Sequence, residues 1–379
     1  MNHRTFRTVV LLLSVLQPLM ALSPVLAGLA ADFPGVPQTL VQQLLSVPQM
    51  VAVPTMLVCG LLARRIASRP LVLAGIAVMV AALVAPAFLT SFGWIFATRV
   101  LAGIGYGMIT PFTLSLIADH FEGAERNTLY GLQGTALNLG GVLFSLIGGL
   151  VGILGWRTNA FVALLGIPFF LMALLGLPRL PVVRREKETA SHFTPAAWRI
   201  YLVIVLSQAF IWVFPPSVAF VLADRGFPGS AVAGTAMMVF TAGGFSGGIL
   251  FTPLHRAVGR HVTAFGFLCG TAGLAVVALA PASYAAFLVG AFLLGLCGSF
   301  SVSCLMVDLT AAVPGASMTA TMSVALSFLV GGTALGPVLS GVVRSVVPGL
   351  AVEAVFLGSA GLLALMAAAQ TLMTRPRSA

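Results

Sequence analysis

An arginine inside a long apolar stretch is the residue whose type and position most clearly indicate chemistry in this chain. Arg99 opens the sequence RVLAGIGYG, and glycines follow it at positions 103, 105 and 107. A cation near the centre of a bilayer costs at least ~2.5 kcal/mol on insertion scales, so it is rarely kept without a function. Such a charge could attract an anion, hold a facing carbonyl or tune a proton site. Alternatively, its long side chain could extend outward to the membrane surface.

The glycines after Arg99 indicate close contacts with neighbouring helices. Arg99, Gly103 and Gly107 are spaced by four residues and share one helix face, while Gly105 points nearly opposite. Faces without side chains let helix backbones approach closely in lipid, so packing alone is one interpretation of Gly103 and Gly107. The spacing does not predict nucleotide binding, because no strand or βαβ unit surrounds it.

Carboxylates that could carry a proton are scarce in this chain. The nine acidic residues are Asp32, Asp119, Glu122, Glu125, Glu186, Glu188, Asp224, Asp308 and Glu353. None lies clearly in the middle of an apolar run, where a shielded carboxylate would titrate. The best candidates for proton binding are Asp32, near the outer helix ends, and Asp308, near the inner ones. The alternative is that both are ordinary charges at helix ends.

Polar side chains within the apolar runs predict a substrate cavity. They are Gln17, Gln42, Gln43, Gln49, Tyr106, Asn138, Gln208 and Trp212. Amides are costly in lipid unless they are paired, so they are expected to face inward. Hydrogen bonds between helices are the alternative for each of them. Together they favour a neutral to positive cavity, suited to an amphipathic compound that is neutral or weakly anionic.

The composition requires a lipid bilayer. Of the 379 residues, 59% are hydrophobic and 7% are charged, against about 25% charged in soluble domains. The apolar run from about Val9 to Ala30 is long enough to span a bilayer, so we interpret it as a transmembrane helix and not as a signal peptide. The net charge of +10 comes mostly from arginines in alternate short loops. This positive-inside pattern predicts a multi-pass protein of the bacterial inner membrane with both termini cytoplasmic, and no nucleic-acid partner.

The remaining reactive residues predict neither an enzyme nor a metal site. Cys59, Cys269, Cys297 and Cys304 have no metal-ligand spacing, and the five histidines are scattered. No catalytic motif or ATP-binding loop is present in the sequence. We therefore expect no enzyme activity and no cofactor.

About twelve apolar segments must position these residues. They run roughly over 7–30, 39–62, 70–89, 93–118, 128–153, 157–178, 197–222, 230–254, 261–281, 284–307, 316–343 and 350–373. The polar stretch between residues 178 and 193 divides them six and six. The predicted fold class is an all-α polytopic membrane protein with two pseudo-symmetric six-helix bundles, 1–178 and 197–379, joined by a cytoplasmic linker, 179–196.

Features of the first half recur in the second at a nearly constant offset. Ala31-Asp32 corresponds to Ala223-Asp224, and Gly103 corresponds to Gly295, each 192 positions later. The fifth and eleventh segments also share a spacing of small residues, in which Gly140 corresponds to Gly332. Two related six-helix halves around a central site are a transporter architecture.

The fourth segment resembles a known family motif. Arg-x-x-x-Gly-x-Gly-x-Gly, complete at Arg99, Gly103, Gly105 and Gly107, is similar to the helix-four motif of the major facilitator superfamily. The resemblance implies two six-helix halves that move solutes by alternating access. It also implies that Arg99 takes part in proton coupling.

Two further stretches match the family only in part. The loop GLLARRIASR matches the family at Gly60, Arg65 and Arg69, but Arg64 stands where the family has an acidic residue. The gate lock that this acidic residue provides is therefore expected to be absent or rebuilt.

The fifth segment is similar to the drug/proton antiporter motif at Gly131, Gly140, Gly148 and Gly149, with Phe144-Ser145 in place of Gly-Pro. Gly-Pro stands instead in the eleventh segment, at Gly336-Pro337, which we expect to act as a hinge.

These observations predict a secondary transporter working by alternating access. The function that they favour is proton-coupled efflux of small amphipathic compounds by a monomer. The alternative is an importer or facilitator of a small metabolite. A receptor or scaffold that transports nothing would not need glycine-rich interfaces around a polar centre in both halves.

Overall fold

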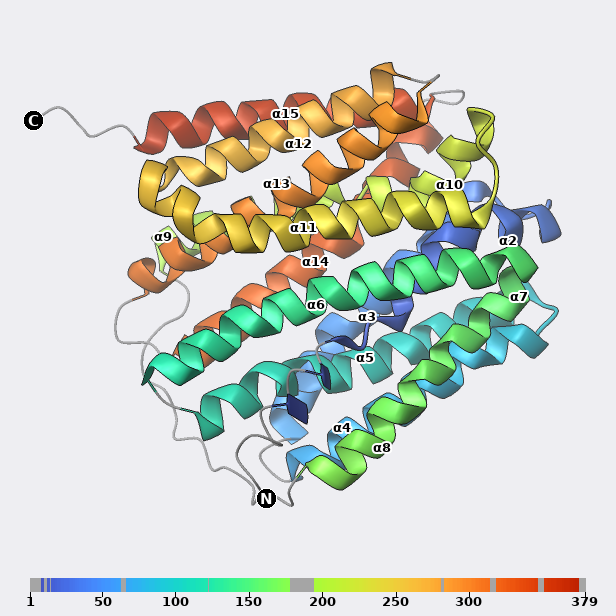
Figure 1. The fold of residues 1–379 in the computed structure, drawn as a ribbon, viewed down its shortest axis with the longest axis horizontal. Helices are drawn as coiled ribbons and strands as arrows, with labels where there is room; N and C mark the ends of the chain where they lie inside the picture. The colour runs from blue at the N-terminus through green and yellow to red at the C-terminus, as the bar shows by residue number, and fades with distance from the viewer. Residues whose placement is uncertain are drawn as a thin grey trace, which may run out of the picture. The chain divides into compact units, whose positions relative to one another are not determined.

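The fold is helical throughout the part of the chain that the computed structural model describes (Figure 1). The described residues are 8–9, 12–13, 15–62, 66–121, 123–177, 194–280, 283–313, 318–346 and 351–374. Among them, 11 helices are long and apolar enough to cross a membrane, and a shorter apolar helix covers Pro18–Asp32. The predicted fold class, an all-α polytopic membrane protein with about twelve spans, is confirmed.

The chain divides into two compact units. The first comprises Met1–Ala190 with Gly229–Gly234, and the second comprises Ser191–Pro228 with Thr235–Ala379. The predicted linker, 179–196, lies outside the described residues up to position 193. The domain boundaries at 178 and 197 stay predictions.

The helices of the first half follow one another with short connections. They are η1 (Pro18–Val25), α2 (Leu26–Asp32), α3 (Gln38–Leu62), α4 (Ser68–Val84), η2 (Ala85–Phe88), α5 (Phe92–His120), α6 (Gly123–Val151), η3 (Gly152–Leu154), α7 (Trp156–Asn159), η4 (Ala160–Leu165) and α8 (Gly166–Gly176). The segments named η are 3-10 helices. The α5 helix packs against both α3 and α4, and α4 also packs against α8.

The second half contains α9 (Pro195–Ile211), α10 (Phe214–Asp224), α11 (Ser230–Val258), α12 (His261–Leu279), α13 (Tyr284–Ala312), α14 (Met318–Val346) and α15 (Val352–Thr374). The α12 helix lies side by side with α15 and with α13 (Figure 1), and α14 packs against α9.

The first span of each half is broken, whereas the sequence predicted continuous helices over 7–30 and 197–222. In the first half the chain leaves the helix at Leu16–Gln17 and continues as the 3-10 helix η1. In the second half a turn at Trp212–Val213 separates α9 from α10. Prolines without N–H donors stand at positions 18, 24, 215 and 216, which explains the lost helical hydrogen bonds.

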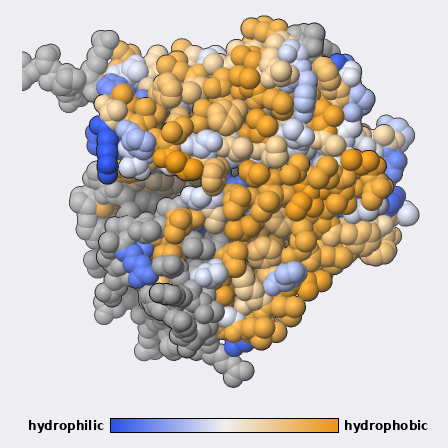
Figure 2. Space-filling model, viewed as in Figure 1, coloured by the Kyte–Doolittle hydropathy of each residue, from blue (hydrophilic) through white to orange (hydrophobic). Residues whose placement is uncertain are grey.

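Hydrophobic side chains cover much of the outer surface of the helices. Figure 2 shows a broad hydrophobic area on the visible face, with the most hydrophilic residues mostly near its edges. Large exposed apolar residues include Leu175, Phe88, Leu154 and Leu279. An apolar surface of this extent is disfavoured in water and matches the hydrocarbon core of a bilayer.

The internal repeat extends to individual helix contacts. A β-carbon built on Gly103 would collide with the backbone of Pro48, and one built on Gly295 would collide with the backbone of Phe240. Both partners of the second contact lie 192 positions after those of the first. The α3–α5 contact is therefore repeated as the α11–α13 contact, in the same register.

Candidate functional site

The α5 helix is held between two neighbours by its glycines. A β-carbon on Gly103 would lie 2.8 Å from Cα of Pro48, and one on Gly107 would lie 2.7 Å from the carbonyl oxygen of Ala52. On another face, a β-carbon on Gly105 would lie 2.7 Å from the carbonyl oxygen of Gly75 in α4. Any side chain at these positions would push the helices apart, so the glycines fix the position of α5 in its bundle.

Arg99 lies on this closely packed helix, two turns after its start at Phe92. Its side chain is buried, with 4% of the residue exposed. The Nε atom has no hydrogen-bond partner among the described residues. A buried cation without a counter-ion is costly. The Nε–H group of Arg99 is therefore a donor that no acceptor among the described residues satisfies.

The α3 and α5 helices run parallel, because Pro48 faces Gly103 and Ala52 faces Gly107, four residues later in both helices. This register places Arg99 level with Leu44. With about 3.6 residues per turn, Arg99 projects to one side of the α3–α5 contact.

Four polar residues share that side of the contact, by the same helical geometry. Gln42 and Gln49 on α3 project there, as do Arg99 and Tyr106 on α5. The two glutamines are buried. The Tyr106 hydroxyl interacts with the side chain of Gln17, the residue at the helix break, and with Thr110. The structure thus brings together three of the predicted residues, Gln17, Tyr106 and Arg99, on one side of α5.

One predicted cavity residue of the first half, Gln43, lies apart from this group. Gln43 projects to the other side of α3 from Gln42 by the same helical geometry. Asn138 is half-buried on α6 and has an interaction partner of its own.

The broken first span is held in place by Asn159, which sequence analysis missed. Its amide nitrogen donates to the carbonyl oxygen of Ala21 in η1, at 3.1 Å, and to that of Gly148 in α6, at 2.6 Å. Gly148 itself lies against Ala21, where a β-carbon would be 2.6 Å from Cα. The only available signal was an asparagine close to the start of an apolar span.

The second half places Gln208 and Trp212 at its own break. Gln208 is buried and Trp212 is half-buried at the end of α9. Two glycines of α14 pack here: a β-carbon on Gly332 would lie 2.8 Å from Cβ of Gln208, and one on Gly336 would lie 2.6 Å from the carbonyl oxygen of Ala209. Pro337, the predicted hinge, is buried inside α14.

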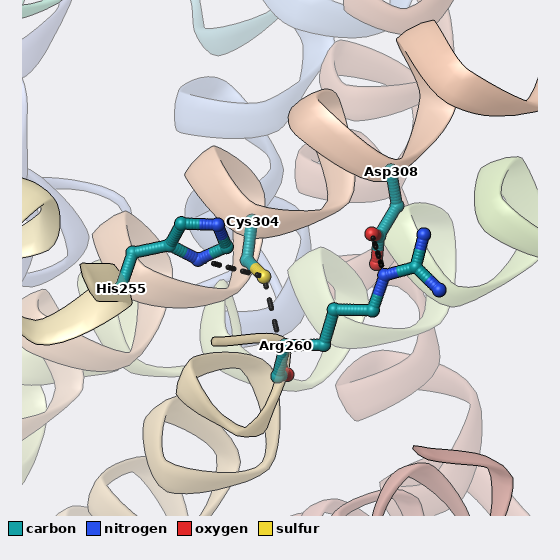
Figure 3. Close-up of polar contacts among 4 residues, drawn as sticks. All are labelled: His255, Arg260, Cys304 and Asp308. Atoms are coloured by element: carbon teal, nitrogen blue, oxygen red, sulfur yellow. Dashed lines mark hydrogen bonds and ion pairs between the residues drawn. The ribbon is translucent and has the colours of Figure 1, made fainter. Parts of the chain in front are cut away.

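A polar cluster joins the α11–α12 turn to the end of α13 (Figure 3). The guanidinium of Arg260 forms an ion pair with Asp308, with 2.8 Å between Nε and Oδ1. The thiol of Cys304 lies 3.9 Å from Nδ1 of His255 and 4.0 Å from the carbonyl oxygen of Arg260. Asp308, the inner candidate for proton binding, is therefore already paired with a cation.

At the opposite helix ends, each half ties its first span to its last. In the first half Trp156 donates its indole N–H to Oδ2 of Asp32, at 2.7 Å. In the second, Arg225 forms an ion pair with Glu353, with 3.1 Å between the nitrogen and oxygen. Asp32, the outer proton candidate, is exposed. Sequence analysis did not foresee either tether.

The family-like loop is described only in part. Gly60 lies in the last turn of α3, and Arg65 lies outside the described residues. Arg69 donates to the carbonyl oxygen of Leu174 in α8, which ties the start of α4 to α8.

Gly140 and Gly148 of α6 both contact backbone atoms of the first span, at Val15 and Ala21. Gly149 is also buried on α6.

Repeated halves, broken first spans and buried polar residues at the breaks define a membrane transport protein. Residues 9–282 match the model of the Major Facilitator Superfamily, so the chain belongs to this family. It is a multi-pass membrane protein of a family of secondary transporters of small molecules.

Similar proteins agree with this classification. A stretch of 132 residues is 35% identical to the uncharacterized MFS-type transporter Rv1250 of Mycobacterium tuberculosis; the match covers 34% of this chain and 23% of that protein. The chain shares its fold with the nucleoside transporter NupG, with a TM-score of 0.76, 16% identity and 100% of both chains covered. It is also similar to the human organic anion transporter MFSD10, with a TM-score of 0.70 and 18% identity over 97% of this chain and 99% of that one.

Proposed function

We propose that the chain exports small amphipathic compounds by alternating access, coupled to proton movement in the opposite direction. The observation that carries this proposal is Arg99, a buried cation with an unpartnered Nε on a helix whose glycines hold it rigidly in place. A fixed positive charge lowers the proton affinity of groups that approach it during transport.

The proton itself would bind to one of two carboxylates near helix ends, Asp32 or Asp308. Asp32 is exposed and hydrogen-bonded by Trp156, whereas Asp308 is paired with Arg260. The ion pair of Asp308 also supplies a cytoplasmic lock, which the loop with Arg64 lacks at its acidic position. We assign proton exchange to Asp32 and the locking role to Asp308.

The moving element would be the helix that carries Gly336 and Pro337. Proline removes a helical hydrogen bond and bends a helix, and Gly336 lets α14 lie directly on the end of α9. Bending at this point would displace Gln208 and Trp212 at the break. We propose a monomer in the bacterial inner membrane with both termini in the cytoplasm, as the distribution of arginines favours.

Proton movement in proteoliposomes tests the proposal. A pH-sensitive dye is enclosed, and amphipathic compounds are added with and without an imposed pH gradient, for the wild type, Arg99→Ala and the exposed-residue control Arg256→Ala. We expect compound-dependent proton flux that is lost in Arg99→Ala and kept in Arg256→Ala. Full flux in Arg99→Ala would contradict the role of Arg99. Compound movement without proton flux would favour the alternative, a facilitator or importer of a metabolite.

A further inference from the structure

Three buried polar groups of the first half lack a hydrogen-bond partner, and one of them is the hydroxyl of Ser145 on α6. The other two are N–H donors on neighbouring helices: Nε of Arg99, in a residue that is 4% exposed, and Nε2 of Gln42, in a residue that is 2% exposed. Neither has a partner among the described residues. Leaving one such group unpaired costs about 1–3 kcal/mol, and more when the group is charged. Two in one bundle indicate that the acceptor is supplied from outside the chain.

The two donors are close along the helices and face the same side. The α3–α5 register sets Arg99 level with Leu44, so Gln42 lies two residues, or about 3 Å, from that level. Both side chains project to the same side of the α3–α5 contact, the side on which Tyr106 meets Gln17. One compact group could therefore accept from both donors.

No described carboxylate provides the missing acceptor. Asp308 and Glu353 are paired with other arginines, and Asp32 is bonded by Trp156 at a helix end. The other two acidic residues whose side chains are described, Glu125 and Asp224, are exposed.

We propose that the transported compound is a monoanion whose acid group, a carboxylate or a group of similar size, binds between Arg99 and Gln42. An ionised carboxylate only accepts hydrogen bonds, so the N–H donors of a guanidinium and an amide match it. The apolar remainder of the compound lies among the hydrophobic residues of the bundle. This inference rests on the proposed transport function for its biological meaning, but its tests measure binding and stability without transport.

The first test needs no ligand, because a carboxylate can be supplied by the chain itself. The substitution Gln42→Glu is made in the wild type and in Arg99→Gln, and thermal unfolding of the purified full-length protein is followed in lipid nanodiscs. We expect Gln42→Glu to raise the melting temperature in the wild type and to lower it in Arg99→Gln, where the new carboxylate has no cation. Equal shifts in the two backgrounds would overturn the shared site.

The second test compares 11-(dansylamino)undecanoic acid with its methyl ester, which differ only in the acid group. Fluorescence titration of nanodiscs, corrected with protein-free nanodiscs, gives the ratio of the two dissociation constants. A charge-assisted hydrogen bond corresponds to about 10- to 100-fold in affinity, so we expect the acid to bind that much more tightly. The ratio should fall below about twofold in Arg99→Gln and in Gln42→Glu, and stay high in Arg256→Gln. A ratio near one in the wild type, or an unchanged ratio in Arg99→Gln, would overturn the proposal. If the wild type shows no compound-dependent proton flux but the ratio of the two dissociation constants is high, only the proposed proton coupling is refuted.

Discussion

Replacement of Gly332 by alanine tests the close contact between α9 and α14. The added β-carbon would lie 2.7 Å from the carbonyl oxygen of Val205 and 2.8 Å from Cβ of Gln208. The first atom belongs to the backbone of a packed helix, so it cannot rotate away, and the two helices must separate by several tenths of an ångström. The neighbouring Gly331 is the matched control, because nothing lies within 4 Å of a β-carbon built there.

The magnitude follows from two opposing terms. Alanine favours a helix over glycine by about 1 kcal/mol, and this gain applies to both variants. Overpacking at Gly332 costs about 1–3 kcal/mol, and this loss applies to Gly332→Ala alone. The difference between the variants, about 1–3 kcal/mol, therefore isolates the contact from the helix propensity. We expect Gly331→Ala to match or exceed the wild type in stability.

Thermal unfolding of the two variants in the same detergent or nanodisc measures this difference. Gly332→Ala should unfold at a lower temperature than Gly331→Ala and should also impair transport, because Gln208 is displaced at the helix break. If the two variants unfold at the same temperature, α14 does not lie against α9 at this distance.

Four other substitutions have expected outcomes of different size. Asn159→Leu removes the donor to two buried carbonyls and should destabilise the protein by about 2–5 kcal/mol, measured by thermal unfolding; a loss below about 1 kcal/mol would show that the carbonyls find other donors. Arg260→Gln and Asp308→Asn should each change stability by less than about 1 kcal/mol, because Arg260 is 62% exposed, and a double-mutant cycle gives their coupling energy. Pro337→Ala should slow substrate transport in proteoliposomes while stability is kept or raised, and an unchanged rate would argue against a hinge in α14.

The sequence predicted the repeat and the glycine contacts because both depend on spacing alone. Gly103 and Gly105 were expected on opposite faces of one helix, and they contact α3 and α4 respectively. The offset of 192 positions, read from the sequence, recurs in the contact of Gly295 with Phe240. Periodicity and register are local properties, so they carry over directly from sequence to structure.

Which prolines would break a helix could not be predicted. Pro48 and Pro337 stand inside continuous helices, whereas prolines 18, 24, 215 and 216 accompany breaks in the first span of each half. The outcome depends on whether neighbours satisfy the carbonyls that a proline frees. In the first half the donor is Asn159, which is 138 residues away from its partner Ala21. A contact between such distant residues leaves no trace in local sequence patterns.

The difference between Gln42 and Gln43 could not be predicted for a related reason. Adjacent residues on a helix project about 100° apart, so only one of them faces the polar side of the α3–α5 contact. The sequence gives the angle between them, but the direction of the contact comes from Pro48 and Ala52 in the folded bundle.

Comparison of corresponding positions in the two halves distinguishes residues needed for packing from residues needed for function. The position in α13 that corresponds to Arg99, 192 residues later, is Ala291, which is fully buried. The contact of Gly103 with Pro48 recurs as that of Gly295 with Phe240, one turn after each of these two positions, so this close contact requires no arginine. Arg99 therefore carries a desolvation cost that Ala291 does not. Such a costly departure from the repeat is expected where binding or coupling requires the residue.

We therefore expect Arg99→Leu to unfold at a higher temperature than the wild type and to transport nothing. On insertion scales a central arginine costs ~2.5–3.5 kcal/mol, which sets an upper bound for the gain in stability. Arg256→Leu, at an exposed position of α11, should change neither property by a comparable amount. If Arg99→Leu is less stable than the wild type, the arginine holds the bundle together, and its unpartnered Nε would no longer indicate a functional site.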